Sequence, residues 1–100
     1  MMMGFEFDEE KAKNMGVTLD MCYNSVDDYM QKKGVYPKKK GIYIESQDGF
    51  DTFAKARIQL PKSWWFLKVI DEWYWFDNEN DIDYNDKGYD CLKSYLANGV

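Results

Sequence analysis

The sequence predicts a small α+β domain with a helix, then a three- or four-stranded, mostly antiparallel sheet, then a C-terminal helix. Three observations support this prediction. Residues 18–33 place apolar side chains at three- and four-residue spacing, residues 52–60 alternate apolar with polar side chains, and residues 64–76 are rich in aromatic and β-branched side chains. With 100 residues and 45% hydrophobic content, the chain is predicted to form one domain, residues 1–100.

The first predicted helix spans residues 18–33. Thr18 is a suitable N-cap and Gly34 a suitable stop. Before this helix, residues 5–7 alternate as in a strand, and residues 8–15 fit one or two helical turns. The apolar face of the helix comprises Leu19, Cys22, Val26, Tyr29 and Met30.

The middle of the chain is predicted to form the sheet. Residues 38–41 predict a turn into a strand at residues 42–45, and residues 47–49 predict the next turn. The alternation in residues 52–60 predicts a strand with one buried face, which Pro61 ends. The buried face of that strand comprises Ala54, Ala56, Ile58 and Leu60.

The aromatic segment is predicted to form two strands, residues 64–70 and 73–77, or one long bent strand. A helix capped by Ser63 is the alternative. Its apolar side chains would surround the whole circumference, and a small domain cannot bury such a helix. We therefore favour the strands.

The last predicted helix begins near Asp86, which can cap it, and ends before Gly99. Asp90 near its start and Lys93 further along also suit the helix dipole. Its apolar face comprises Tyr89, Leu92, Tyr95 and Leu96.

The chain contains no histidine, which excludes serine–histidine and cysteine–histidine nucleophile systems. Cys22 and Cys91 are the only cysteines and form no C-x-x-C motif. We predict that they are free, partly buried thiols, with a disulfide between two helices as the alternative. These absences favour a protein that is not an enzyme and needs no cofactor.

The acidic segment begins a calcium-loop pattern but does not complete it. Asp81, Asp83 and Asn85 supply the first ligand positions, yet the sixth and twelfth positions hold Asp86 and Leu92 in place of glycine and glutamate. We therefore predict no metal site.

The formal charge of −5 lies entirely in the C-terminal part of the chain. Residues 1–62 carry ten acidic and ten basic side chains, whereas residues 63–100 carry eight acidic side chains and three lysines. Such an asymmetry predicts a partner with a basic surface. The lysine-rich segment does not favour direct nucleic-acid binding, because the chain is acidic and has a single arginine. Its five lysines are Lys32, Lys33, Lys38, Lys39 and Lys40.

Four carboxylates occupy alternate positions, namely Asp77, Glu79, Asp81 and Asp83. In an extended chain they would lie on one side, about 6.6 Å apart, which is comparable to the spacing of phosphates along a nucleic-acid strand. This row, prolonged by Asp86 and Asp90, is a candidate mimic of nucleic acid. The competing interpretation, which we favour for the row itself, is a solvated edge that maintains solubility and blocks strand addition.

All four tryptophans lie within residues 64–75, more large rings than one face of a small sheet can bury. At least one ring is therefore expected near the surface, as an anchor for a partner or for self-association. The predicted partner-binding residues are Asp77, Glu79, Asp81, Asp83, Asp86, Asp90, Trp64, Trp73 and Trp75.

The most favoured function is a small acidic binding protein that inhibits a larger basic partner, which is itself a nucleic-acid-binding protein. The composition, but no motif, resembles that of phage-encoded acidic inhibitors, whose targets would be a host nuclease, a defence complex or the transcription machinery. The alternatives are an immunity protein that neutralises a toxin, and an assembly module or homodimer joined through exposed aromatics. A hydrolase using Asp71 or Glu72 ranks last. Without a signal sequence or membrane span, the expected location is the cytoplasm, that of the host if the protein is viral.

Overall fold

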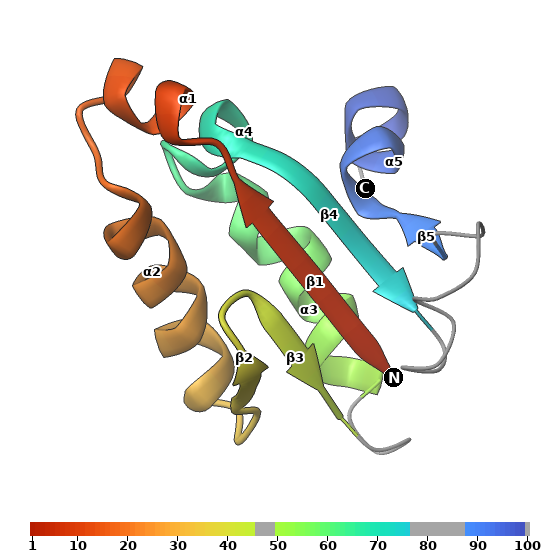
Figure 1. The fold of residues 1–100 in the computed structure, drawn as a ribbon. Helices are drawn as coiled ribbons and strands as arrows, with labels where there is room; N and C mark the ends of the chain where they lie inside the picture. The colour runs from red at the N-terminus through yellow and green to blue at the C-terminus, as the bar shows by residue number, and fades with distance from the viewer. Residues whose placement is uncertain (46–49, 77–87, 100) are drawn as a thin grey trace.

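The computed structural model describes residues 1–45, 50–76 and 88–99, which form a two-layer α+β domain (Figure 1). The predicted fold class is therefore confirmed. The elements in chain order are β1 (Met2–Phe7), α1 (Glu9–Asn14), α2 (Leu19–Gln31), β2 (Pro37–Lys39), β3 (Ile42–Ile44), α3 (Phe50–Gln59), the 3₁₀ helix η2 (Leu60–Lys62), α4 (Phe66–Val69), β4 (Ile70–Phe76), β5 (Tyr89–Asp90) and α5 (Cys91–Asn98).

The sheet has the strand order β2-β3-β1-β4-β5, and all neighbouring strands are antiparallel. The described sheet has five strands, whereas the prediction was three or four. The additional strand of most consequence is β1, which precedes the first helix and lies at the centre of the sheet. The alternation at residues 5–7 indicated this strand, although not its central position.

The helices that the sequence predicts near the N-terminus are confirmed. Asp8 caps α1, since its carboxylate accepts a hydrogen bond from the Lys11 backbone N–H at 2.8 Å. Thr18 caps α2 in the same way, through the Met21 N–H at 3.1 Å. Helix α2 ends before Gly34, as expected, and buries Cys22, Val26 and Met30 from its predicted face.

The strand predicted at residues 52–60 is wrong, because this segment forms the helix α3. Its apolar residues alternate, yet Phe53, Ala56 and Leu60 also recur at three- and four-residue spacing, and these are the side chains that become buried. Ile58, which the strand would have buried, is half exposed. The i,i+4 ion pair between Lys55 and Asp51, at 2.9 Å, also suits the helix.

The strand predicted at residues 64–70 is also wrong. Trp64 and Trp65 lie in a turn, and α4 follows as a single helical turn that leads directly into β4. The alternative helix capped by Ser63 fails as well, because α4 begins after Trp65. A helix of this length can be apolar on all sides, because the core accommodates its few side chains, among them Phe66 and Val69. The second strand of the prediction, residues 73–77, lies largely within β4.

The C-terminal helix starts later than predicted. Asp90, and not Asp86, is the N-cap of α5, where its carboxylate accepts from the Lys93 N–H at 2.9 Å. Gly99 ends the helix as expected. Of the predicted apolar face, Tyr89 precedes the helix and Leu96 is exposed, whereas Cys91 is the buried residue. Asp86 and the turn predicted at residues 47–49 lie outside the described residues.

The turn predicted at residues 38–41 is only partly right, because the short strand β2 occupies Pro37–Lys39 and pairs with β3 in a hairpin. Within the described ranges, no helix is long and apolar enough to cross a bilayer.

Helices α2, α3 and α4 pack against one face of the sheet, and an aromatic cluster fills the space between the two layers. Phe5 stacks on Trp73 with ring centroids 5.8 Å apart, and the Phe66 ring meets Trp73 edge-on at 5.0 Å. These contacts join β1, β4 and α4. Aromatic pairs in such arrangements add about 0.5–1.5 kcal/mol each to their area burial. In the view of Figure 1, α3 lies behind β1 and β4, and no described helix crosses in front of them.

Cys22 and Cys91 are buried free thiols in this structure. Burial raises the pKa of the Cys22 thiol, and it raises the pKa of Cys91 to about 12. The thiolate is the reactive form, and a raised pKa keeps it scarce. We therefore expect neither cysteine to react with a disulfide reagent at about pH 8 while the protein is folded. Both should react once concentrated guanidinium chloride unfolds the chain. Rapid reaction of one thiol per folded molecule would contradict this placement.

Candidate partner-binding groove on the open sheet face

The face of the sheet opposite α2, α3 and α4, here called the open face, follows from strand alternation. In β1, Met3, Phe5 and Phe7 point into the core, so the residues between them point the other way. The strand register places the outward side chains of neighbouring strands opposite one another. The three outward pairs across β1 and β4 are Met2 with Phe76, Gly4 with Tyr74, and Glu6 with Glu72.

Gly4 leaves a hollow at the centre of this face. Its backbone is not among those with positive φ, so a side chain would be tolerated by the conformation of the strand. A glycine inside a strand costs stability and often marks a place where another molecule approaches closely. The hollow over Gly4 has a volume of about 250 Å³. Its lining comprises Met2, Gly4, Phe5, Glu6, Ile42, Glu72, Tyr74 and Phe76.

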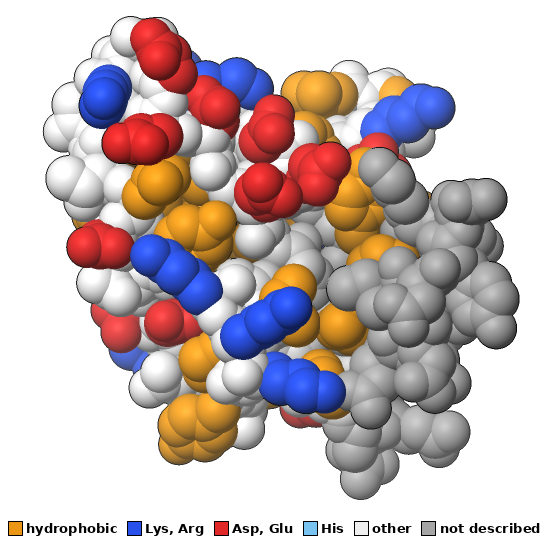
Figure 2. Space-filling view, viewed as in Figure 1, with side chains coloured by type: hydrophobic (Ala, Val, Ile, Leu, Met, Phe, Trp, Pro, Cys, Tyr) orange, Lys and Arg blue, Asp and Glu red, His pale blue; other side chains and the backbone are white. Residues whose placement is uncertain are grey.

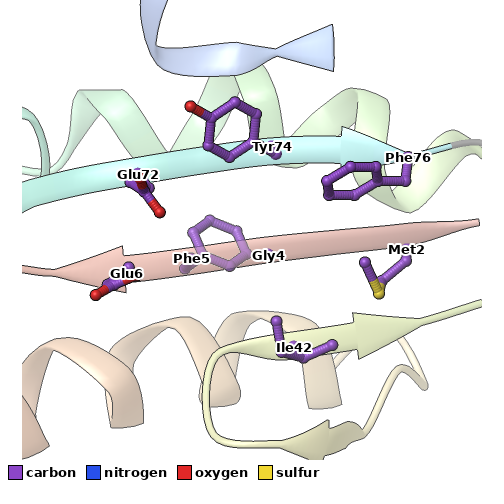
Figure 3. Close-up of a pocket in the computed structure, with 8 residues that line it drawn as sticks. All are labelled: Met2, Gly4, Phe5, Glu6, Ile42, Glu72, Tyr74 and Phe76. Atoms are coloured by element: carbon purple, nitrogen blue, oxygen red, sulfur yellow. The ribbon is translucent and has the colours of Figure 1, made fainter. Parts of the chain in front are cut away.

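The hollow is polar at one end and apolar at the other. Figure 3 shows Glu6 and Glu72 side by side at one end and Met2 and Phe76 at the other. Ile42 and Tyr74 line the two sides. A ligand that fits this lining would combine an apolar portion with a cationic group.

Glu6 and Glu72 are a directly opposed pair of like charges, an arrangement that destabilises a sheet. Both side chains are exposed, and no lysine or arginine in the described part of the chain pairs with either of them within 4 Å. Asp71 beside them is partly neutralised by Lys11, at 3.8 Å. The carboxylate pair is therefore open to a cation from outside the chain.

The pKa of Tyr74 is affected by the negative charge of this surface. Its hydroxyl is hydrogen-bonded to Asp90. Burial raises the pKa of the Tyr74 phenol, and the carboxylates of Asp90, Glu72 and Asp71 raise it further. Four acidic side chains therefore surround the central part of the open face, since Glu6 lies opposite Glu72.

A second hollow extends the first towards α5. It shares Glu72 and Tyr74 with the hollow over Gly4, so the two hollows adjoin, and together we call them the open-face groove. The extension adds Asp71, Asp90, Leu92, Lys93, Leu96 and Ala97. Figure 2 shows acidic side chains gathered along the upper part of this face and lysines below them. The groove thus has an apolar floor and a predominantly acidic rim.

The structure exposes some of the predicted partner-binding residues and buries others. Trp64 is 65% exposed, which confirms the expectation of at least one surface ring. Trp73 and Trp75 are core side chains, so burial removes them from any binding surface. Asp90 borders the groove, although it also caps α5. The remaining predicted acids, Asp77, Glu79, Asp81, Asp83 and Asp86, lie outside the described residues.

Sequence reasoning missed the residues that form the groove in β1 and β3. Gly4, Glu6 and Ile42 were not among the predicted site residues, although a signal was present. A glycine in a strand of alternating apolar residues indicates a local hollow, and the acidic residue two positions later lies on the same face.

Two lysines of the lysine-rich segment make contacts within the fold. Lys40 contacts Asp20 at 3.3 Å and lies over the Tyr23 ring, 4.9 Å from its centroid. Lys33 lies over the Tyr29 ring at 5.2 Å. The prediction against a basic nucleic-acid site stays untested, but these contacts assign part of the cluster a structural role.

Within residues 1–45, 50–76 and 88–99, no group of three or more histidine, cysteine, aspartate or glutamate side chains could hold a metal ion. Comparison of the chain with protein-family models, with curated proteins and with solved structures finds no match.

Proposed function

We propose that the protein is a small non-enzymatic binding protein that docks a larger partner with a basic surface on its open-face groove, and so inhibits that partner. The observation that carries the proposal is that Glu6 and Glu72 lie opposite each other beside an apolar hollow, with no cation of the described chain paired to them. Interfaces gain affinity from a desolvated apolar centre, and complementary charge at the rim speeds association and selects the partner. The groove offers both features on one face.

The acidic row that begins after β4 would also attract a partner with a basic surface. Asp77, Glu79, Asp81 and Asp83 belong to the segment that carries the excess negative charge of the chain. A basic, nucleic-acid-binding partner would be attracted to both regions, in which case the protein acts as a nucleic-acid mimic. Replacing these four residues by asparagine and serine should weaken partner binding and leave folding nearly intact. In this proposal the partner is met in the cytoplasm, that of the host if the protein is viral.

The proposal predicts that Glu6→Gln combined with Glu72→Gln weakens partner binding by about tenfold or more, equivalent to about 1.4 kcal/mol. The measurement is capture of a partner from cells of the source organism at low salt, followed by titration of the purified pair. Raising the salt concentration should weaken the wild-type complex, because exposed charges are screened. The wild-type protein should also inhibit the activity of the captured partner.

The matched control is Glu10→Gln combined with Asp28→Asn, which removes two charges from the exposed surfaces of α1 and α2. This control should retain wild-type affinity within about twofold, since single rim charges contribute little. The Glu6 and Glu72 variant should also unfold at equal or slightly higher urea concentration, because a like-charge pair has been removed. Equal affinity of both variants and the wild type would contradict the proposal.

Self-association is the second candidate function, and exposed apolar side chains favour it. Trp64 and Leu96 are 65% and 70% exposed, and Ile58 on α3 is also exposed. Large exposed apolar groups mark interaction sites when they are contiguous. Light scattering after size-exclusion chromatography separates the two functions, because an inhibitor of this kind is expected as a monomer and an assembly module as an oligomer.

A further inference from the structure

We propose that the hollow over Gly4 receives the side chain of one arginine from the partner, with the aliphatic stem over Gly4 and the guanidinium between Glu6 and Glu72. This inference rests on the proposed function and names the group that anchors the partner. It follows from the shape of the hollow, the chemistry of its two ends, and the state of the protein's own arginine.

The shape favours a single slender side chain. Ile42 and Tyr74 line the two sides, and the floor is the backbone of β1 at Gly4. From Gly4 to Glu6 the strand advances two residues, about 6.6 Å. A side chain that enters over Gly4 and runs along β1 therefore brings its end to the carboxylates. The apolar lining suits methylene groups, which arginine and lysine bury while keeping their charge at a polar end.

The charged end favours arginine. Its planar guanidinium presents five donors and can pair with two carboxylates at once, whereas the lysine ammonium is a compact and strongly hydrated charge. A guanidinium also stacks on aromatic rings such as that of Tyr74. Uncharged apolar side chains would leave the opposed carboxylates as they are, and phosphates would be repelled by them.

The arginine must come from another protein. The chain has one arginine, Arg57, and its guanidinium donates to the Tyr89 hydroxyl at 3.0 Å and lies 4.6 Å from the centroid of that ring. It also lies over the Trp75 ring, at 5.7 Å. A second copy of the chain could offer this residue only by breaking these contacts. The occupant is therefore a basic segment of a different protein.

The test is a titration of the isotope-labelled full-length chain with N-acetyl-arginine amide, followed by amide chemical shifts. N-acetyl-lysine amide and N-acetyl-norleucine amide serve as probes of charge and of apolar character. We expect the arginine probe to shift the signals of Gly4, Glu6, Ile42 and Tyr74, with a dissociation constant on the order of millimolar. The lysine probe should bind about fivefold more weakly or worse, and the norleucine probe should not saturate.

Two variants localise the effect. Gly4→Leu fills the hollow and keeps both carboxylates; the first added atom would meet only the flexible end of Ile42, at 3.3 Å. Glu6→Gln combined with Glu72→Gln keeps the hollow and removes both charges. Each variant should weaken arginine binding by about tenfold or more. If Gly4→Leu does not fold, the glutamine variant alone still decides the question.

Several results would overturn the inference. Equal binding of lysine and arginine would make the site one for any cationic side chain, and equal binding of norleucine would make it a purely apolar pocket. Shifts confined to other surfaces would show that the probe binds elsewhere. A captured partner that keeps its affinity for Gly4→Leu but loses it for the glutamine variant would leave the proposed function standing and refute the arginine anchor. Arginine binding without any salt-sensitive partner would refute the proposed function instead.

Discussion

Replacing Trp73 by alanine is expected to lower the free energy of unfolding by about 3–5 kcal/mol. The indole is fully buried on β4, stacks on Phe5 and meets Phe66 edge-on. Its removal leaves a cavity at the contact between the central strands and α4. A domain of this size has about 5–15 kcal/mol of stability in total, so this one change should remove a large share of it. Urea unfolding followed by circular dichroism measures the loss.

Trp64→Ala is the matched control, because it removes the same side chain from an exposed position. Trp64 is 65% exposed, so the change should alter the free energy of unfolding by no more than about 0.5 kcal/mol. Similar losses in the two variants would contradict the assignment of Trp73 to the core. The comparison therefore separates a structural tryptophan from one that is available to a partner.

Replacing Gly41 by alanine is expected to cost about 3 kcal/mol or more, the second large effect. Gly41 has a φ of +81°, and an added Cβ would lie 2.5 Å from the backbone oxygen of Phe5 and 2.9 Å from the Tyr23 ring. The Gly41 carbonyl also accepts a hydrogen bond from the Phe5 N–H at 2.8 Å. The β2–β3 hairpin therefore approaches the central strand through Gly41, and alanine would push the two backbones apart.

Gly16→Ala isolates the cost of the backbone conformation alone. Gly16 has a φ of +72°, yet an added Cβ would meet no atom within 4 Å. Alanine there should cost only about 1–2 kcal/mol, the penalty of a left-handed conformation. The difference between the two variants measures the clash at Gly41. If both variants lose the same stability in urea unfolding, the close approach of the hairpin to β1 is not as described.

Helix α2 was predictable from the sequence, whereas helix α3 was not. Thr18 defines the start of α2, and the apolar spacing that follows fits a helix alone. In α3, by contrast, Ala54 and Ala56 are compatible with both periodicities, because alanine is small enough for either face. The choice there depends on packing, since Phe53 finds its place against the Trp75 ring, with centroids 6.1 Å apart.

The aromatic segment misled the prediction for a related reason. Apolar residues on all sides exclude a long helix in a small domain, but a single turn such as α4 can be surrounded by core. Sequence periodicity does not detect an element of four residues. Trp73 and Trp75 were predicted as binding residues because four indoles exceed what one sheet face can bury, yet both belong to the core.

The candidate groove was only partly predictable. The excess of acidic side chains indicated a basic partner, and Asp90 was among the predicted residues. The hollow itself arises because Gly4 and Glu6 meet Tyr74 and Glu72, residues almost seventy positions later in the chain. Only the register of β1 with β4 brings them together, and the sequence does not specify which strands become neighbours.

The pairing of β1 with β4 also has a consequence for how quickly the protein folds. Met2 pairs with Phe76, so the central strand β1 and its neighbour β4 close the largest loop among the paired strands described. Contacts between residues so far apart are formed slowly, because the entropy of the intervening chain must be lost before they are gained. During synthesis, β1 leaves the ribosome well before β4 has been made. Its apolar side chains, Met3, Phe5 and Phe7, therefore stay exposed until their partner strand is available. We therefore expect the nascent chain to depend on chaperones until residue 76 has emerged.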